Sequence, residues 1–164
     1  MILQELKTKP FFDFRGKYVE SFNLKKVKKK FKINFVQDDF SYSKKNVLRG
    51  FHGDNFTWKL FTCVYGKIQI AVINFDKNSK NYKKNKSIIL SEDNNTQILV
   101  PPKHGVAHLI LSDRAILHYK QSTYYKDHEQ FTISHNSPCL NFKWKSKKFI
   151  LSKRDKGDKA IILT

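Results

Sequence analysis

The chain has 164 residues, of which 32 are Lys or Arg and 14 are Asp or Glu, so its formal net charge is 32 − 14 = +18. Hydrophobic residues make up 40% of it and aromatic residues 14%, which excludes a disordered chain and suits one domain with one core. No apolar run approaches the roughly 20 residues of a membrane-spanning helix, and the start, MILQELKTKPFF, lacks the layout of a signal peptide. We expect a single domain over residues 1–164, in the cytoplasm and without a membrane partner.

Taken along the chain, the first predicted element is a short, marginal helix over residues 21–31, which begins with a serine. From residue 35 onward, alternating apolar and polar residues predict β-strands, with turn residues between them. Many short strands at this spacing are typical of sandwiches and closed jelly rolls, so the fold class is all-β with a few short helices. The predicted strands occupy residues 35–43, 47–52, 58–75, 86–91, 96–102, 107–112 and 115–121.

The basic tail carries apolar residues at 149–151 and 161–163, so we expect it to pack on the domain. Cys63 and Cys139 belong to no paired motif and indicate neither a disulfide framework nor a thiolate metal site.

The basic charge indicates an anionic partner but does not identify one. Most of it is lysine scattered along the chain, whereas nucleic-acid readers depend on arginine, so we do not expect a nucleic acid partner. Where lysine fills nearly every basic position, a retained arginine marks a place that needs a planar, bidentate guanidinium, as phosphate recognition does. Arg15 and Arg49 are our candidates, and chance retention is the alternative.

Residues 46–60 place Arg49, His52 and Lys59 in one predicted strand–turn–strand. Alternation puts Leu48, Gly50 and His52 on one face and Arg49 with Phe51 on the other, and Gly50 leaves room for an approaching group. A histidine base and a nearby ammonium are what proton abstraction next to a carbonyl requires. The alternative is a half-exposed loop histidine without a role.

Two further residues would complete such a site. Tyr119 falls on the same face of its predicted strand as Leu117 and Gln121, where it is a candidate proton donor, although strand tyrosines are more often core residues. Asp155 could orient His52 by accepting a hydrogen bond from its ring, or it could be an ordinary surface carboxylate.

Signatures of bound cofactors are missing from the sequence: it has no Gly-rich dinucleotide loop, phosphate-loop lysine motif or paired CxxC. We therefore expect no organic cofactor. Jelly-roll metal sites often use a His-x-His pair, but this chain has His52-Gly53-Asp54. A metal site built from His52, Asp54 and His108 is thus a weak alternative, and we expect no metal.

Five segments together resemble the dTDP-4-dehydrorhamnose 3,5-epimerase family of nucleotide-sugar epimerases, and the resemblance runs from about residue 11 to residue 155. It implies a cupin-like β-barrel without metal or organic cofactor, and a homodimer in which an N-terminal segment reaches across to its partner. It also implies an enzyme of surface polysaccharide synthesis that inverts C3, C5 or both of a dTDP- or GDP-linked 4-keto-6-deoxy sugar through an enolate. The segments are FFDFRGKYVESF, FVQDDFSYSKKNVLRGFHG, KLFTCVYGKI, ILVPPKHGVAHLILSDRAILHYKQSTYY and ILSKRD.

The resemblance also implies a role for each matching residue. His52 is the general base and Asp155 its partner, while Lys59 stabilises the enolate and Tyr119 is the acid on the opposite face of the sugar. Residues implied in substrate binding, with the two arginines on the diphosphate, are Arg15, Glu20, Arg49, His108 and Tyr125.

Two of the chain's departures from the family pattern concern the predicted site. Gly53-Asp54 fills a shortened gap between His52 and Lys59, and Val106-Ala107-His108-Leu109 replaces the usual Ala-His-Gly-Phe. The HGD…TWKL form is similar to members that act in capsular and surface-sugar pathways, including members that use GDP-linked deoxyheptoses, so the nucleotide, the sugar and the number of inverted centres stay open. Two alternatives are a 3,4-ketoisomerase, which typically has a second histidine soon after the first, and a non-catalytic module that binds anionic nucleotides or nucleic acid.

Overall fold

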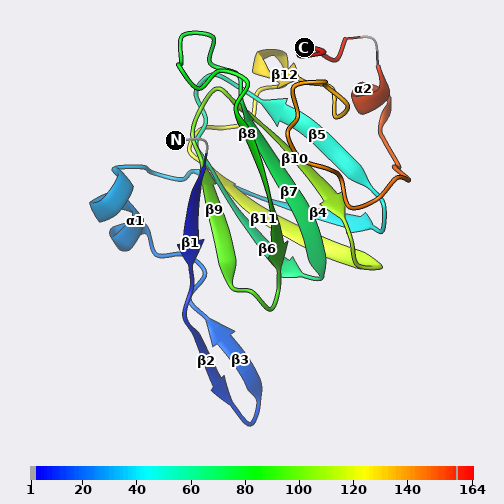
Figure 1. Cartoon of the computed structure of the whole chain (residues 1–164). Helices are drawn as coiled ribbons and strands as arrows, with labels where there is room; N and C mark the ends of the chain where they lie inside the picture. The colour runs from blue at the N-terminus through cyan, green and yellow to red at the C-terminus, as the bar shows by residue number, and fades with distance from the viewer. Residues whose placement is uncertain (1–2, 158) are drawn as a thin grey trace.

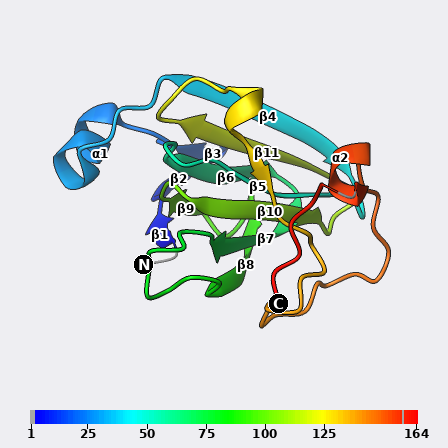
Figure 2. The same ribbon diagram turned by 90° about the horizontal axis from the view of Figure 1, so that it is seen from above.

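Two five-stranded antiparallel sheets pack against each other in the computed structural model, which describes residues 3–157 and 159–164 (Figures 1 and 2). The first sheet contains β1 (Gln4–Lys7), β4 (Gln37–Lys44), β6 (Lys59–Tyr65), β9 (Thr96–Val100) and β11 (Arg114–Gln121). The second contains β5 (Leu48–Gly53), β7 (Lys67–Asn74), β8 (Asn85–Ser91), β10 (His104–Ile110) and β12 (Phe131–Thr132). Their orders are β1-β9-β6-β11-β4 and β12-β5-β10-β7-β8.

This arrangement confirms the predicted all-β, cupin-like jelly roll. Every predicted strand is present, and the run 58–75 contains two of them, β6 and β7, which turn at Gly66 with φ of +75°. The single domain was predicted over residues 1–164, of which 1, 2 and 158 lie outside the described residues. Among the residues described, no helix is long and apolar enough to cross a bilayer.

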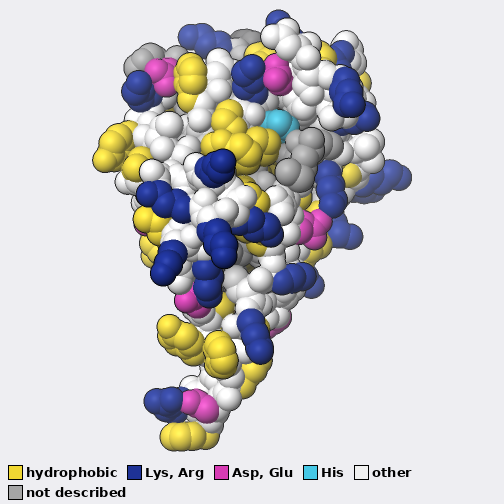
Figure 3. All heavy atoms as spheres, turned by 90° about the vertical axis from the view of Figure 1, so that its left-hand side faces the viewer, with side chains coloured by type: hydrophobic (Ala, Val, Ile, Leu, Met, Phe, Trp, Pro, Cys, Tyr) yellow, Lys and Arg dark blue, Asp and Glu magenta, His cyan; other side chains and the backbone are white. Residues whose placement is uncertain are grey.

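The N-terminal segment contains strands that the alternation did not predict. After β1, the strands β2 (Pro10–Asp13) and β3 (Gly16–Val19) form a hairpin that projects away from both sheets (Figures 1 and 3). The predicted helix is present as α1 (Leu24–Phe31), but it begins three residues later than expected. Its N-cap is Asn23, whose side chain accepts from the Lys26 N–H, so the cap is an asparagine rather than the serine.

The core lies between the sheets, where strands of both contribute fully buried side chains such as Leu117, Ile98 and Ile70. A second buried cluster lies on the other side of β5, β7 and β10, where the C-terminal tail covers Leu48, Phe51 and Ile73. The expected packing of the tail is therefore confirmed. The short helix η1 (Asp127–Glu129) precedes the tail, and α2 (Lys153–Lys156) lies within it.

The alternation predicted along β5 is wrong. Leu48 and Phe51 are both fully buried under the tail, whereas Arg49 and His52 both face the space between the sheets. The pattern breaks at Gly50, whose φ of +105° is a conformation that side-chain-bearing residues rarely adopt, and the β5–β10 register slips beside it. A Cβ atom at Gly50 would lie 2.2 Å from the Val106 carbonyl oxygen, so the room at this glycine is taken by β10 and not by a ligand.

Candidate active site

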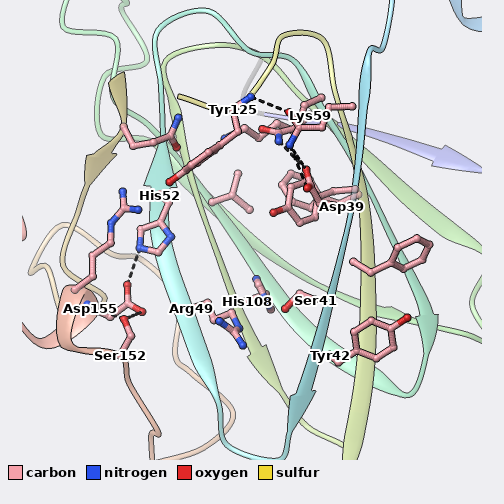
Figure 4. Close-up of a pocket in the computed structure, with 18 residues that line it drawn as sticks. Asp39, Ser41, Tyr42, Arg49, His52, Lys59, His108, Tyr125, Ser152 and Asp155 are labelled. Carbon is pink, nitrogen blue, oxygen red and sulfur yellow. Dashed lines mark hydrogen bonds and ion pairs between the residues drawn. The ribbon is translucent and has the colours of Figure 1, made fainter. Parts of the chain in front are cut away.

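A cavity of about 610 Å³ opens between the two sheets, and we call it the site cavity (Figure 4). β4, β6 and β11 form one wall, β5 and β10 form the other, and α2 closes one end. Its polar or ionisable lining residues include most of the predicted site: Arg49, His52, Lys59, His108, Tyr119, Tyr125 and Asp155.

His52 and Asp155 form the best-defined polar contact in the site cavity. His52 Nε2 lies 2.7 Å from Asp155 Oδ1, and the Asp155 side chain is 2% exposed (Figure 4). A carboxylate can only accept, so Nε2 is the donor and the lone pair of the neutral ring is on Nδ1. The imidazole is thereby oriented to take up a proton at Nδ1.

The carboxylate of Asp155 is held in place by its own helix start. Ser152 is the N-cap of α2, accepts from the Asp155 N–H and donates its hydroxyl to Asp155 Oδ2 at 2.7 Å. Burial raises the pKa of Asp155, but the hydrogen bonds from His52 and Ser152 outweigh burial and leave the pKa below its ordinary value. Asp155 is therefore the ionised partner of His52.

Lys59 begins β6 and lies almost buried in the wall opposite His52. Its Nζ is 3.3 Å from Oδ2 of the buried Asp54. Burial lowers the pKa of Lys59, and the charge of Asp54 opposes that shift. An ammonium group that is shielded from water interacts strongly with charge that develops beside it.

Tyr119 lies in β11, where it packs against Phe61 with ring centroids 5.3 Å apart. His118 and Lys120 face away from the cavity and pair with Asp38, as the predicted alternation requires. Burial, with a smaller effect of Asp39, raises the pKa of Tyr119, so its hydroxyl stays protonated and can donate.

Arg49, His108 and Tyr125 surround the rest of the cavity. Arg49 and His108 are register partners on β5 and β10 and lie together at one end (Figure 4). Burial lowers the pKa of His108 to about 3, with a further effect of Arg49, so this histidine is neutral. Its Nε2 is buried without a hydrogen-bond partner in the part of the chain that the structure describes. Tyr125 is half exposed at the opposite end and donates its hydroxyl to Asp127.

Arg15 and Glu20 do not lie at the site cavity of their own chain. Arg15 is in the turn of the β2–β3 hairpin, where it pairs with Asp13. Glu20 follows β3 and pairs with Lys26 of α1 at 2.5 Å. Within one chain the structure therefore brings seven of the nine predicted site residues together and leaves these two outside.

The alternative metal site is not assembled. Asp54 is hydrogen-bonded to backbone N–H groups behind Lys59 and does not line the cavity with His52 and His108. Within residues 3–157 and 159–164, no three His, Cys, Asp or Glu side chains are grouped so that they could hold a metal ion.

Several lining residues were not predicted. Asp39 of β4 accepts from the side-chain amides of Gln37 and Gln121, which lie beside Lys59 in the wall. Arg154 and Gln130 also line the cavity. A signal was present in β4, because Gln37, Asp39 and Ser41 alternate with aromatic residues. The polar set is half-buried here, whereas Phe40 and Tyr42, which also border the cavity, are exposed.

The arrangement supplies a base, an acid and a cation around one space. His52 comes from the second sheet, whereas Tyr119 and Lys59 come from the first, so a flat ring bound between the sheets meets the base on one side and the acid on the other. Such a geometry suits abstraction of a proton on one face of a ring and its return on the other.

Comparison with known proteins decides the family. The family model described as dTDP-4-dehydrorhamnose 3,5-epimerase matches residues 3–161. The chain belongs to the dTDP-4-dehydrorhamnose 3,5-epimerase family. The dTDP-4-dehydrorhamnose 3,5-epimerase of Escherichia coli K12 is 33% identical over 156 residues, which are 92% of this chain and 84% of that protein.

Solved structures of the dTDP-4-dehydrorhamnose 3,5-epimerase family share this fold. The 3,5-epimerase of Legionella pneumophila, in complex with dTDP-4-keto-L-rhamnose, is 28% identical with a TM-score of 0.92, covering 98% of this chain and 87% of that one. The enzyme of Bacillus anthracis, with TDP and PPi bound, is 30% identical with a TM-score of 0.89, covering 94% and 91%.

Proposed function

We propose that this member of the family is an epimerase that inverts C3, C5 or both of a nucleotide-linked 4-keto-6-deoxy sugar. The observation that carries the proposal is the placement of His52 and Tyr119 on opposite sheets at one cavity, with Lys59 on the same sheet as Tyr119. The Legionella protein was solved with a nucleotide-linked keto sugar, which supports a ligand of that class here.

The reaction requires no group beyond these side chains. His52 Nδ1 takes the proton from the carbon next to the keto group, and the electron pair moves to the keto oxygen to give an enolate. The Lys59 ammonium stabilises the charge on that oxygen. The Tyr119 hydroxyl then gives its proton to the same carbon from the opposite face, and both groups regain their protonation states by exchange with water.

Arg49 is the proposed diphosphate ligand on this chain. It lines the cavity with an exposed side chain, and within the described residues its guanidinium has one side-chain hydrogen-bond partner, the Ser43 hydroxyl at 3.2 Å. His108 beside it has a buried nitrogen that a sugar hydroxyl or phosphate could satisfy. Tyr125 presents a half-exposed ring on which a nucleotide base can stack.

We further propose a homodimer in which the β2–β3 hairpin of one chain reaches the cavity of the other. The hairpin exposes Phe11, Phe12 and Phe14 to 60%, 73% and 97%, an apolar surface that a second copy can cover (Figure 3). Arg15 at its tip would then contact the diphosphate in the partner's site. This arrangement gives Arg15 and Glu20 the substrate-binding roles that their own chain does not offer them.

Incubation with dTDP- and GDP-linked 4-keto-6-deoxy sugars in heavy water, followed by NMR, tests the proposed function. We expect deuterium at C3, C5 or both and an inverted product. A 3,4-ketoisomerase would instead move the keto group, and a binding module would leave every sugar unchanged. A role in surface polysaccharide synthesis and a cytoplasmic location stay predictions.

A further inference from the structure

Asp54 lies directly behind Lys59, on the side away from the cavity. It follows the last residue of β5 in the turn to β6 and is 5% exposed. Lys59 and Gln130 line the cavity, whereas Asp54 does not. Asp54 therefore does not touch a molecule bound in the cavity, whereas Lys59 and Gln130, which it contacts, do line the cavity.

The two carboxylate oxygens of Asp54 have different partners. Oδ1 accepts from the backbone N–H groups of Phe56 at 2.9 Å and Thr57 at 2.7 Å, which closes the turn. Oδ2 accepts from Gln130 Nε2 at 3.1 Å and lies 3.3 Å from Lys59 Nζ. One oxygen is enough for the turn, so the second oxygen and the negative charge are available to the cavity wall.

The charges around Lys59 make Asp54 its main counter-ion. Burial lowers the pKa of Lys59; Asp54 opposes this most strongly, Asp39 opposes it weakly from β4, and Arg154 adds to the lowering from α2. The other titratable groups on the cavity walls are Tyr42, Arg49, His52, His108, Tyr119, Tyr125 and Asp155. Asp54 itself is ionised at neutral pH, because backbone N–H groups and Lys59 outweigh its burial and bring its pKa to about 2.

We propose that Asp54 is a positioning residue for the reaction, which keeps Lys59 charged and directed at the oxygen on which enolate charge develops. This inference rests on the proposed function. It differs from a purely structural role, because the turn needs Oδ1 but not a charge, and because Oδ2, the oxygen next to Lys59, accepts from Gln130 on a separate segment.

The substitution Asp54→Asn separates the two roles. Asparagine keeps one carbonyl oxygen for the Phe56 and Thr57 N–H groups and places an NH₂ group against Lys59 and Gln130. We expect kcat to fall at least about tenfold with little change in KM, because the stabilisation is greatest for the developing enolate. The alkaline limb of the kcat profile should move to lower pH, because Lys59 loses its proton more readily.

A second measurement needs no substrate. The pH dependence of acetylation of Lys59, followed by peptide mass spectrometry with trace acetic anhydride, reports its pKa directly. We expect acetylation to begin at lower pH in Asp54→Asn than in the wild type. The matched control is Asp76→Asn, since Asp76 also accepts from a turn N–H, that of Asn78, and lies 3.4 Å from Lys103 Nζ away from the cavity. It should change neither kcat nor Lys59 acetylation.

The outcomes are distinguishable. If the wild type is active but Asp54→Asn shows an unchanged acetylation profile of Lys59 or an unchanged kcat, the inference about Asp54 is wrong and the proposed function stands. A wild type that inverts no sugar overturns the proposed function, whatever the acetylation shows, and the inference with it. If Asp54→Asn does not fold, Asp54→Ser retains one oxygen for the turn and is tested in the same way. If neither variant folds, the role of Asp54 is structural and the inference is wrong.

Discussion

His52 and Asp155 are 103 residues apart in the sequence, yet His52 Nε2 and Asp155 Oδ1 lie 2.7 Å apart. The contact joins β5 of the second sheet to the short helix α2 in the tail. Because Asp155 is ionised and fixed by Ser152, the orientation of the His52 ring depends on how the tail packs, far along the chain from the strand that carries His52.

Removal of the base should stop the reaction and spare binding. We expect His52→Asn to lower kcat by about 10²–10⁴-fold and to abolish deuterium incorporation, while the Kd for dTDP stays within about twofold. NMR in heavy water and calorimetry measure the two quantities. His118→Asn, on the outer face of β11, is the control and should keep full activity. Persistent exchange in His52→Asn would show that another group is the base.

Removal of the acid should separate abstraction from inversion. In Tyr119→Phe the imidazole can still take the proton, exchange it with solvent and return it to the same face. We therefore expect deuterium in the unreacted sugar with little inverted product. The measurement is the ratio of exchanged substrate to product by NMR. If Tyr119→Phe forms product at the wild-type rate, another group supplies the proton.

Arg49 should bind the diphosphate through the planar geometry of its guanidinium. We expect Arg49→Lys to weaken dTDP binding about tenfold, because lysine keeps the charge but loses the bidentate contact. Calorimetry with dTDP measures this, and Arg114→Lys, outside the cavity lining, is a matched control. Equal affinity in the two variants would remove Arg49 from the binding site.

The hairpin exchange makes a quantitative prediction. In a mixture of His52→Asn and Arg15→Ala chains, each mixed dimer has one site with an intact His52 and an intact Arg15 from the partner. Random re-association after denaturation and refolding should therefore restore about a quarter of wild-type activity, since about half of the dimers are mixed and each has one working site. Absence of recovery, with each single variant folded, contradicts the exchange.

Stability at acid pH should report the buried Asp54. Its pKa is about 2 in the folded protein against an ordinary value of 3.8. The folded state therefore releases this proton more readily than the unfolded state, and the resulting ~2 kcal/mol of stability is present above about pH 4 and lost as the pH falls towards 2. Urea unfolding at several pH values should show the difference between wild type and Asp54→Asn shrinking over that range. A difference independent of pH would mean that Asp54 is not ionised in this way.

The strands after residue 35 could be predicted because runs rich in β-branched and aromatic residues are separated by turn residues, and β4 also shows a period of two, since only one of its faces is partly buried. β7, β9 and β10 are buried on both faces and are marked by their apolar runs rather than by alternation. β1, β2 and β3 could not be predicted, since each has only four residues and the hairpin exposes its aromatic side chains instead of burying them. The alternation along β5 failed because one residue, Gly50, adopts a backbone conformation that reverses the faces after it.

Single residues of the site could be proposed from residue chemistry, but their assembly could not. His52 and Lys59 are close in sequence, whereas Tyr119 and Asp155 could be named as candidates but are brought to His52 only by the pairing of the strands and the packing of the tail. Asp39 and Gln37 were missed because polar residues on an alternating strand are expected to face water, and here they face a polar cavity. Asp54 was considered only as a metal ligand, since its distance from Lys59 depends on the turn between β5 and β6.

The projecting hairpin has a thermodynamic consequence for the proposed dimer. In the proposed dimer, Phe11, Phe12 and Phe14 hold the two chains together, and Arg15 of one chain binds the ligand in the site of the other. Dimerisation and ligand binding are then linked equilibria. Dilution, which dissociates the dimer, would then lower the affinity for the nucleotide, and bound nucleotide would in turn favour dimerisation.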